Sequence, residues 1–546
     1  MIPINRRRFV QGAASAGALL ARPALAAPAL LSGTEFALEI GEVPINITGR
    51  PGTAVGINGL VPAPILRWRE GETVSIAVTN RLREHTSIHW HGVRVPSAMD
   101  GVPGMSFPGI APGATFVYRF PVTQAGTYWY HGHSGFQEQI GLYGAIVIEP
   151  RAGYTMPFDR DYVVLLSDWS DDSPASIVSN LKFQSDYYNF GQRTAGTFAA
   201  DTRRQGIAAT LADRLAWGRM RMSPADILDV NGSTYTYLIN GQPPDANWTA
   251  LYRPGERVRL RFINGSAMSI FDVRIPGLAL TVVQADGNDV APVTVDEFRI
   301  GAGETYDVIV RPDAGGAYAI FAQAMDRSGF ARGTLAPRPG MSAPVPAMDR
   351  RPLRTMADMG MAGMAMGETM DHGSAGHGVP APSGIGVDNT APMPAARQDE
   401  PGTGLEDNGR RVLTYADLRA LRPGGDSRAA SREIVLHLTG NMQRFIWGFD
   451  GEKASDAPSI NLRRGERVRI VLINDTMMEH PTHLHGLWSE LENGQVAPRP
   501  LKHTILVKPG ERLAFLVTAD EPGRWAFHCH LLYHMQLGMI REVRVS

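Results

Sequence analysis

The chain has 546 residues, more than a single hydrophobic core usually holds, so we expect about two to four domains. A formal net charge of -1 argues against a nucleic-acid partner, and 20% charged residues with an ordinary apolar content indicate a soluble globular protein. The single cysteine excludes an internal disulfide, so its thiol either binds metal or is simply buried.

The N-terminus has the pattern of an export signal. Arg6, Arg7 and Arg8 form a twin-arginine pattern, an Ala- and Gly-rich apolar run follows, and residues 24–26 (Ala-Leu-Ala) are a plausible cleavage site. A short amphipathic tail is the alternative. We assign residues 1–33 to the signal peptide and N-terminal tail, and we expect export after folding, with a periplasmic location. No later run reaches the roughly 18 apolar residues of a membrane span, so no span is expected.

Two motifs recur three times along the chain. The first, a turn followed by an alternating strand, occupies residues 71–80, 255–264 and 465–474. The second, a turn and then a strand rich in aromatic or apolar residues, occupies residues 112–130, 302–320 and 509–527. Strands and turns at this spacing, with few helical stretches, predict an all-β chain of β-sandwiches. We expect three such domains, at residues 34–150, 158–330 and 410–546.

Two stretches lack the strand pattern. Residues 177–217 have room for short helices inserted into the second domain. Residues 331–409 are rich in Pro, Gly and Met, a composition that predicts a flexible linker or surface loop because it cannot bury a core. One interpretation is low-complexity filler. The other is a Cu(I)-binding segment, since thioethers suit Cu(I); its candidate ligands are Met356, Met359, Met361, Met364, Met366, Met370, His372 and His377.

Four clusters contain ten of the fifteen histidines: His89 and His91; His131 and His133; His480, His483 and His485; and His528, His530 and His534. The repeats relate these clusters to one another, because His89 follows Asn80 by nine residues and His483 follows Asn474 by nine. The first and third domains therefore have equivalent pairs of H-x-H strands. The same positions of the middle domain hold Val273, Ile275, Phe321 and Gln323, so we expect the middle domain to act as a spacer.

Cys529 lies between His528 and His530. In an extended strand, residues i and i+2 face one way and i+1 faces the other, so the two histidines face one site and the cysteine faces another. His480, Cys529 and His534, with the thioether of Met539, would make a mononuclear site of blue-copper type. The eight remaining histidines suit a multinuclear site between two domains. Zinc is the rival metal, but zinc sites do not require this division.

These motifs resemble those of three-domain multicopper oxidases, the superfamily of laccases, ascorbate oxidases and cuprous oxidases. The resemblance covers nearly all of the mature chain. It is strongest to periplasmic copper-resistance members, on the twin-arginine signal, the Met/His-rich segment, and residues 99–104, 137–139 and 439–442. The resemblance implies cupredoxin-like Greek-key β-sandwich domains and four copper ions: one of type 1, one of type 2 and two of type 3.

The resemblance also implies the role of each ligand. Type 1 copper would be bound by His480, Cys529 and His534 with Met539 as axial ligand, type 2 by His89 and His483, and type 3 by His91, His131, His133, His485, His528 and His530. Asp100 would deliver protons near the three-copper cluster; the alternative is a turn carboxylate. Met535 stands where several bacterial relatives have a glutamate on the proton path, so no second acid is assigned.

The implied activity is one-electron oxidation of a reductant coupled to reduction of dioxygen to water. Cys529 would carry the electrons, and the reductant would be Cu(I), in copper tolerance. The alternatives are a laccase-like oxidase of phenols or other small organic donors, and a copper-sequestering protein; copper-delivery proteins are possible partners. We expect the type 1 site near the surface, with His480 or His534 reachable by substrate. His85, His437 and His503 are expected to be ordinary residues.

Overall fold

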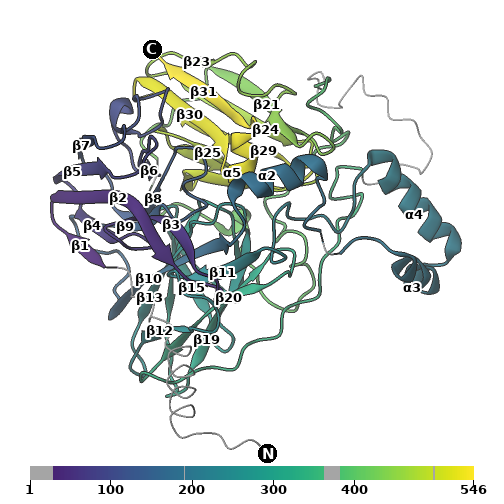
Figure 1. The fold of residues 1–546 in the computed structure, drawn as a ribbon, viewed down its shortest axis with the longest axis horizontal. Helices are drawn as coiled ribbons and strands as arrows, with labels where there is room; N and C mark the ends of the chain where they lie inside the picture. The colour runs from purple at the N-terminus through teal and green to yellow at the C-terminus, as the bar shows by residue number, and fades with distance from the viewer. Residues whose placement is uncertain (1–28, 190, 362–381, 423, 496–497) are drawn as a thin grey trace, which may run out of the picture.

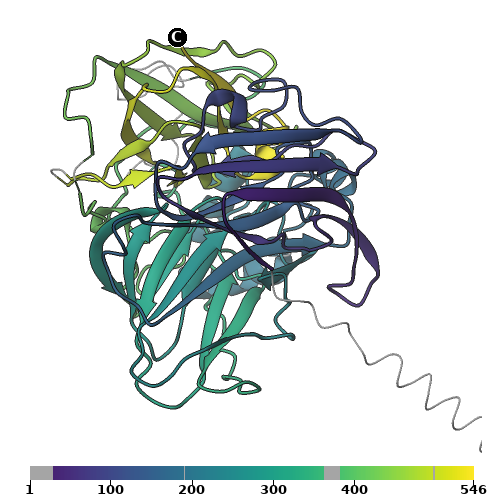
Figure 2. The ribbon, with the colours of Figure 1, turned by 90° about the vertical axis from the view of Figure 1, so that its left-hand side faces the viewer.

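The computed structural model describes residues 29–189, 191–361, 382–422, 424–495 and 498–546. Strands dominate it and form six sheets, which pair as three β-sandwiches, so the predicted all-β fold is confirmed. Figures 1 and 2 show the three sandwiches arranged so that each lies against the other two. None of the described helices is both long enough and apolar enough to cross a membrane.

The first sandwich contains two sheets that enclose a core of aromatic and aliphatic side chains, among them Trp68, Trp90 and Phe120. One sheet has the order β1 (Leu30–Ser32), β4 (Ile65–Arg69), β9 (Tyr143–Glu149), β8 (Gly126–His131) and β6 (His89–His91). The other has the order β3 (Gly52–Ile57), β2 (Glu35–Ile45), β5 (Thr73–Asn80) and β7 (Thr115–Pro121). Exposed and buried residues alternate along the first half of β2, as expected for a strand with one face on the core.

The second sandwich follows the same plan. One sheet has the order β11 (Tyr235–Ile239), β10 (Arg160–Ser170), β13 (Val258–Asn264), β18 (Thr305–Val310), β15 (Leu280–Ala285) and β16 (Asn288–Val295). The other has the order β12 (Trp248–Leu251), β20 (Phe330–Ala336), β19 (Tyr318–Ala324), β14 (Phe271–Arg274) and β17 (Glu297–Ile300).

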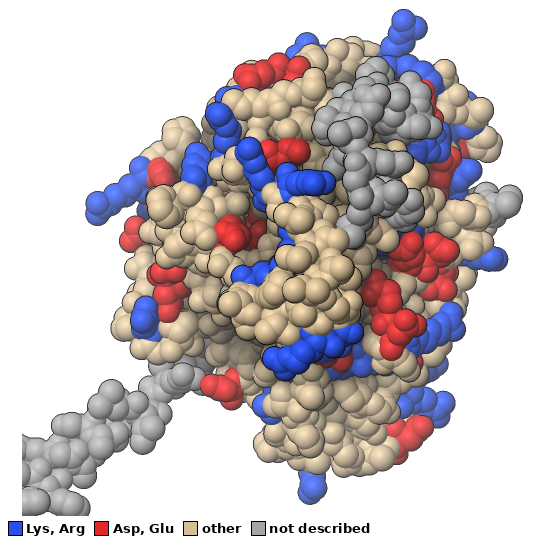
Figure 3. Space-filling view, turned by 90° about the vertical axis from the view of Figure 1, so that its right-hand side faces the viewer, with Lys and Arg blue, Asp and Glu red and all other residues tan. Residues whose placement is uncertain are grey.

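The expected short helices in the second domain are confirmed: α2 (Pro174–Phe183), α3 (Ala195–Gln205) and α4 (Ile207–Met220). The Ser173 side chain caps α2 and the Thr194 side chain caps α3, each satisfying a backbone N–H of the first turn. Figure 1 shows α3 and α4 projecting from the body of the molecule. The face turned toward the viewer in Figure 3 has cationic and anionic side chains interspersed.

The third sandwich contains the C-terminal ligand motifs. One sheet has the order β22 (Ile446–Phe449), β21 (Arg432–Asn441), β24 (Arg467–Asn474), β29 (Arg512–Thr518), β26 (Ser489–Glu492) and β27 (Leu501–Lys502). The other has the order β23 (Ile460–Leu462), β31 (Ile540–Val545), β30 (Gly523–Cys529), β25 (His480–Leu484) and β28 (Thr504–Val507). Helix α5 (Leu532–Gln536) follows β30, and short 3-10 turns occupy Ser97–Met99 and Tyr415–Asp417.

The first repeated motif forms the same strand in each sandwich. Strands β5, β13 and β24 pair in parallel with β2, β10 and β21, and antiparallel with β7, β18 and β29. Each ends in an asparagine whose amide donates to a backbone carbonyl far along the chain: Asn80 to Ile110, Asn264 to Ile300 at the end of β17, and Asn474 to Val507 at the end of β28, at 2.8, 3.0 and 3.1 Å. The asparagine therefore makes the equivalent contact in each domain.

The described parts of residues 331–409 are packed against the second and third sandwiches. Met359 and Met361 are 1% and 8% exposed and belong to the hydrophobic core that both sandwiches share. Asp358 pairs with Arg397 at 3.0 Å, and Met393 N donates to Gly360 O at 3.1 Å. The expectation that this segment buries no core is therefore wrong for the described part, since Met side chains fill apolar space readily. Met364, Met366, Met370, His372 and His377 lie outside the described residues.

Candidate functional site

Two pairs of short strands position the histidines. In the first sandwich, β6 pairs antiparallel with β8, so that His89 lies opposite His131. In the third, β25 pairs antiparallel with β30, so that His483 lies opposite His528. Because alternate residues of a strand face the same side, each strand pair presents its imidazoles on one face.

We call the eight residues of the H-x-H pairs the eight-histidine cluster: His89, His91, His131, His133, His483, His485, His528 and His530. None of them is more than 8% exposed. The His89 ring stacks on His485 and the His91 ring on His483, each pair with centroids 3.8 Å apart. Both stacked pairs join the first sandwich to the third, so the cluster lies at the interface between these domains.

Within the cluster, imidazoles from different strands approach one another closely. His133, His485 and His528 offer ligand atoms that all lie within 4.8 Å of one another. The His530 ring lies 4.8 Å from the His91 ring and 5.1 Å from the His131 ring, centroid to centroid. His89 Nε2 and His483 Nε2 are 3.4 Å apart. The eight histidines therefore form overlapping groups whose ring nitrogens are close enough to share bound metal ions.

Neighbouring oxygens fix the orientation of most of these rings. His89 Nδ1 lies 2.8 Å from the Asp100 carbonyl oxygen, His483 Nδ1 lies 2.6 Å from the His503 carbonyl oxygen, and His528 Nδ1 lies 2.8 Å from the Cys529 carbonyl oxygen. At two further histidines the partner of Nδ1 is a carboxylate oxygen. Asp100 Oδ2 lies 2.8 Å from His485 Nδ1, and Glu138 Oε2 lies 2.7 Å from His131 Nδ1. An oxygen partner on Nδ1 leaves Nε2 as the atom that binds metal.

Several cluster nitrogens have no hydrogen-bond partner in the described structure. They are buried, and they include Nε2 of His131, His133 and His530. A buried ring nitrogen without a partner costs free energy, of the order of 1–3 kcal/mol. Neutral imidazoles are good ligands of copper, so the donor set fits copper ions, which would satisfy these nitrogens.

Burial controls the charge of the cluster. It lowers the pKa of His131, His133 and His485 well below the usual range, and neighbouring imidazoles lower it further. Burial also lowers the pKa of His528, to about 4. These four rings are therefore neutral at neutral pH, with a lone pair free for metal.

A second group of donors surrounds the cysteine. We call His480, Cys529, His534 and Met539 the cysteine site. Cys529 Sγ lies 3.5 Å from His480 Nδ1 and 3.7 Å from His534 Nδ1, and the two Nδ1 atoms are 3.3 Å apart. Met539 is fully buried, and its carbonyl accepts the Cys529 N–H at 3.1 Å. Burial raises the pKa of the thiol well above its usual range, so a bound cation would be needed to hold the thiolate.

The imidazoles of the cysteine site are not reachable from solvent. His480 and His534 are both 0% exposed. Trp447 stacks on the His534 ring with centroids 3.8 Å apart, and Asp229 Oδ2 lies 2.7 Å from His534 Nε2. The prediction that substrate would reach one of these rings directly is wrong, because both rings are fully buried.

Three residues beside the candidate metal sites were not predicted to lie there. His503 was expected to be ordinary, but its Nδ1 lies 3.2 Å from His91 Nε2, in the wall of the cluster. Glu138 was noticed only within the family motif at 137–139, and nothing in the sequence distinguished Asp229. Asp100, by contrast, was predicted beside the cluster, and its carboxylate contacts His485 at 2.8 Å and His89 at 3.3 Å.

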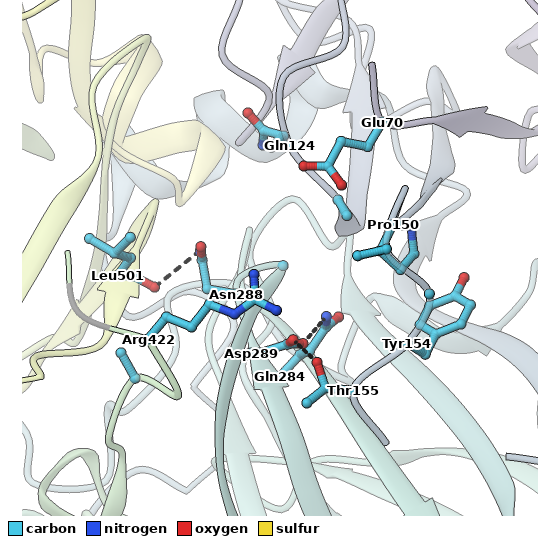
Figure 4. A pocket seen from close by; sticks show the side chains of 15 residues that line it. Glu70, Gln124, Pro150, Tyr154, Thr155, Gln284, Asn288, Asp289, Arg422 and Leu501 are labelled. Atoms are coloured by element: carbon cyan, nitrogen blue, oxygen red, sulfur yellow. Dashed lines mark hydrogen bonds between the residues drawn. The ribbon is translucent and has the colours of Figure 1, made fainter. Parts of the chain in front are cut away.

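Two cavities lie near these residues. One of about 280 Å³ opens where the three domains meet, and Figure 4 shows Glu70, Gln124, Asn288 and Arg422 around it. None of the predicted copper ligands lines it. A smaller one, of about 10 Å³, is lined by His89, His483 and His503, and it has room for about one water molecule beside the cluster.

Comparisons with known proteins agree with the geometry. The Multicopper oxidase family description matches residues 39–153, 160–337 and 427–546. The Copper resistance protein A homolog of Pseudomonas syringae pv. tomato is 54% identical, with 99% of each chain covered. Copper resistance protein A of Escherichia coli is 52% identical, with 100% of each chain covered. The solved structure of Fet3p, a multicopper oxidase that functions in iron import, superimposes with a TM-score of 0.67 over 94% of this chain and 91% of its own, at 19% identity.

Proposed function

Because the chain belongs to the multicopper oxidase family and is therefore an oxygen-using oxidoreductase, we propose that it oxidises Cu(I) and reduces dioxygen to water, as part of copper tolerance. The similarity to Copper resistance protein A over the whole chain supports this choice of substrate. The twin-arginine pattern supports a periplasmic location.

One observation carries the proposal: the tripeptide His528-Cys529-His530 belongs to both metal sites. Cys529 faces His480 and His534, whereas His528 and His530 face the eight-histidine cluster. We assign the type 1 ion to the cysteine site, the type 2 ion to His89 and His483, and the type 3 pair to the other six histidines. Bound copper would supply the one-electron chemistry and the reduction of dioxygen. The chain supplies a short covalent path between the sites.

We assign proton supply to Asp100. Its Oδ2 is 2.8 Å from His485 Nδ1 and its Oδ1 is 3.3 Å from His89 Nδ1, so the carboxylate lies directly behind two ligands. Its first task is to orient these rings, and its second is to hold a proton near the site of oxygen reduction. Burial of Glu138 beside His131 gives the cluster a second carboxylate of the same kind.

We assign only some of the candidate Cu(I) ligands between Met356 and His377, here called the Met segment, to Cu(I) delivery. Met359 and Met361 are buried in the core, so they cannot meet Cu(I) from solvent in this conformation, and Met356 is only half-buried. The candidates that lie outside the described residues, from Met364 to His377, remain assigned to Cu(I) binding.

Oxygen uptake by the purified, copper-loaded protein tests the proposed function, with Cu(I) and then a phenol as the sole electron donor. Fast uptake with Cu(I) and little with the phenol is the expected result. The reverse result would favour the laccase-like alternative, and no uptake with either donor would leave copper sequestration. The covalent link between two distinct metal sites argues against sequestration, because a protein that only stores copper needs no electron path between its ions.

A deletion of residues 362–377 tests the Met segment separately. It leaves Met356, Met359 and Met361 in place, so the core remains intact. We expect slower uptake with Cu(I) and unchanged turnover of an organic donor. An equal loss for both donors would contradict a role in Cu(I) delivery.

A further inference from the structure

Asp286 belongs to the middle sandwich, which holds none of the predicted ligands, and lies in the turn between β15 and β16. Its side chain is fully buried. Oδ2 accepts the backbone N–H groups of His503 and Thr504, both at 3.1 Å, and Oδ1 accepts that of Thr305 at 3.0 Å. One carboxylate therefore fastens the start of β28 in the third sandwich to the second sandwich.

The same turn makes further contacts with this segment of the third sandwich. Lys502 Nζ lies 3.0 Å from Asp286 and 2.9 Å from Glu304, and all three side chains are buried. The Asn288 amide donates to the Leu501 carbonyl at 3.4 Å, on the side of the turn that faces the cavity in Figure 4. Removing one partner of a buried ion pair is strongly destabilising, so these contacts hold residues 501–504 in one place.

Residues 501–504 in turn contact the eight-histidine cluster. The His503 carbonyl lies 2.6 Å from His483 Nδ1, which directs His483 Nε2 toward His89 Nε2, 3.4 Å away. Thr504 Oγ1 lies 3.0 Å from His91 Nε2. The middle sandwich also approaches the cluster at Gly303, where a Cβ would lie 2.9 Å from the His530 ring.

We propose that Asp286 is a positioning residue for the eight-histidine cluster. Through the backbone of His503 it sets the orientation of His483, and thereby the affinity and geometry of the ion bound between His89 and His483. The middle sandwich then does more than separate the other two, because it holds residues that orient the predicted ligands. The inference rests on the proposed function only in taking that ion to be the type 2 copper.

The D286N variant tests this inference in the full, copper-loaded chain. Copper content, the electron paramagnetic resonance spectrum and the blue absorption are measured on the same sample. We expect the type 2 signal to be lost or altered, and copper affinity at that position to fall by up to about 10- to 100-fold, the range found when the hydrogen bonds behind a metal ligand are disturbed. The blue absorption of the cysteine site should persist, because none of its ligands contacts Asp286.

D289N is the matched control. It makes the same change of charge three residues further on, where Asp289 accepts from Thr155 and Gln284 at the cavity. Its spectrum should match that of the wild type. A D286N protein with full copper content and an unchanged type 2 signal would overturn the inference, as would an equal effect of D289N.

A second variant covers the case in which D286N does not fold. D286E keeps a negative charge opposite Lys502 but moves the carboxylate, so it should lose or alter the type 2 signal in a folded protein; an unchanged signal would overturn the inference. Wild-type protein that binds no copper would instead overturn the proposed function, and this inference with it.

Discussion

Each imidazole has two ring nitrogens, and its neighbours decide which of them faces the metal. At five residues of the eight-histidine cluster, His483 and His485 among them, an oxygen partner on Nδ1 leaves Nε2 free, whereas at His91 the oxygen partner, Thr504 Oγ1, is on Nε2. In the cysteine site the reverse holds, because Thr476 Oγ1 lies 2.7 Å from His480 Nε2 and Asp229 lies 2.7 Å from His534 Nε2. At His483, His485 and both imidazoles of the cysteine site, the nitrogen left free for metal is therefore set by an oxygen of a residue outside the predicted ligands.

Replacing the sulfur of Cys529 should abolish the blue colour of the protein. In C529S a hard hydroxyl replaces the soft thiolate on which a blue-copper site depends. We expect no strong visible absorption and oxygen uptake at background level, measured by absorption spectroscopy and an oxygen electrode. Copper analysis should still find metal in the eight-histidine cluster. Persistent blue colour would contradict the assignment of Cys529.

Acid should destabilise the copper-free protein in a defined window. Burial lowers the pKa of His528 from 6.5 to about 4, so between these values the unfolded chain binds a proton that the folded chain does not. The stability due to the neutral ring is therefore present above about pH 6.5 and is lost as the pH falls toward about 4.

Thermal unfolding of the copper-free protein between pH 7 and 4 measures this loss. The copper-loaded protein should resist acid longer, because bound metal stabilises the folded state. A melting temperature that stays constant over this range would contradict the assignment of neutral, buried imidazoles.

At the scale of elements, the repeated strand explains how one sequence motif gives three related sandwiches. Strands β5, β13 and β24 occupy the same position and end in the same asparagine contact. Only the first and third sandwiches place histidines on the strands that follow. The fold therefore recurs three times, whereas the donors of the eight-histidine cluster come together only where the two histidine-bearing sandwiches meet.

The segment after the second sandwich should contribute to stability through its buried methionines. Met359→Ala removes a side chain that is 1% exposed, so we expect unfolding to become easier by about 2–5 kcal/mol. Met393, at 49% exposure, is the matched control, and Met393→Ala should change little. Denaturant titration measures the unfolding free energy of both variants. An equal loss in the two variants would contradict the packing of Met359.

At the scale of the whole molecule, buried ion networks join the sandwiches. Asp307 of the second sandwich pairs with Arg259 and Arg261 at 2.6 and 2.9 Å, and accepts from Thr127 of the first at 2.9 Å. Asp286 and Lys502 join the second sandwich to the third. Because the eight-histidine cluster lies between the first and third sandwiches, its geometry depends on the second sandwich holding both.

Removing the Asp307 network should lower the unfolding free energy of the protein. Asp307→Ala leaves two buried guanidinium groups without this partner, which we expect to cost about 3–5 kcal/mol of unfolding free energy. Asp313, 83% exposed beside Arg311, is the control, and Asp313→Ala should cost at most about 1 kcal/mol. Chemical denaturation measures both, and a neutral Asp307→Ala would show that the sandwiches associate without this network.

The sequence alone determined the all-β fold and the histidine and cysteine motifs at the two metal sites, because strand alternation, internal repeats and H-x-H spacing are local patterns. It also indicated Asp100, through a motif next to the first histidines. The tertiary structure decided which residues lie behind the predicted ligands: Asp229 behind His534, Glu138 behind His131, and Asp286 behind the backbone of His503, which contacts His483. It also decided that Met359 is core and that both imidazoles of the cysteine site are covered. These features depend on how distant segments, most of them in different sandwiches, pack together, and no local period in the sequence encodes that packing.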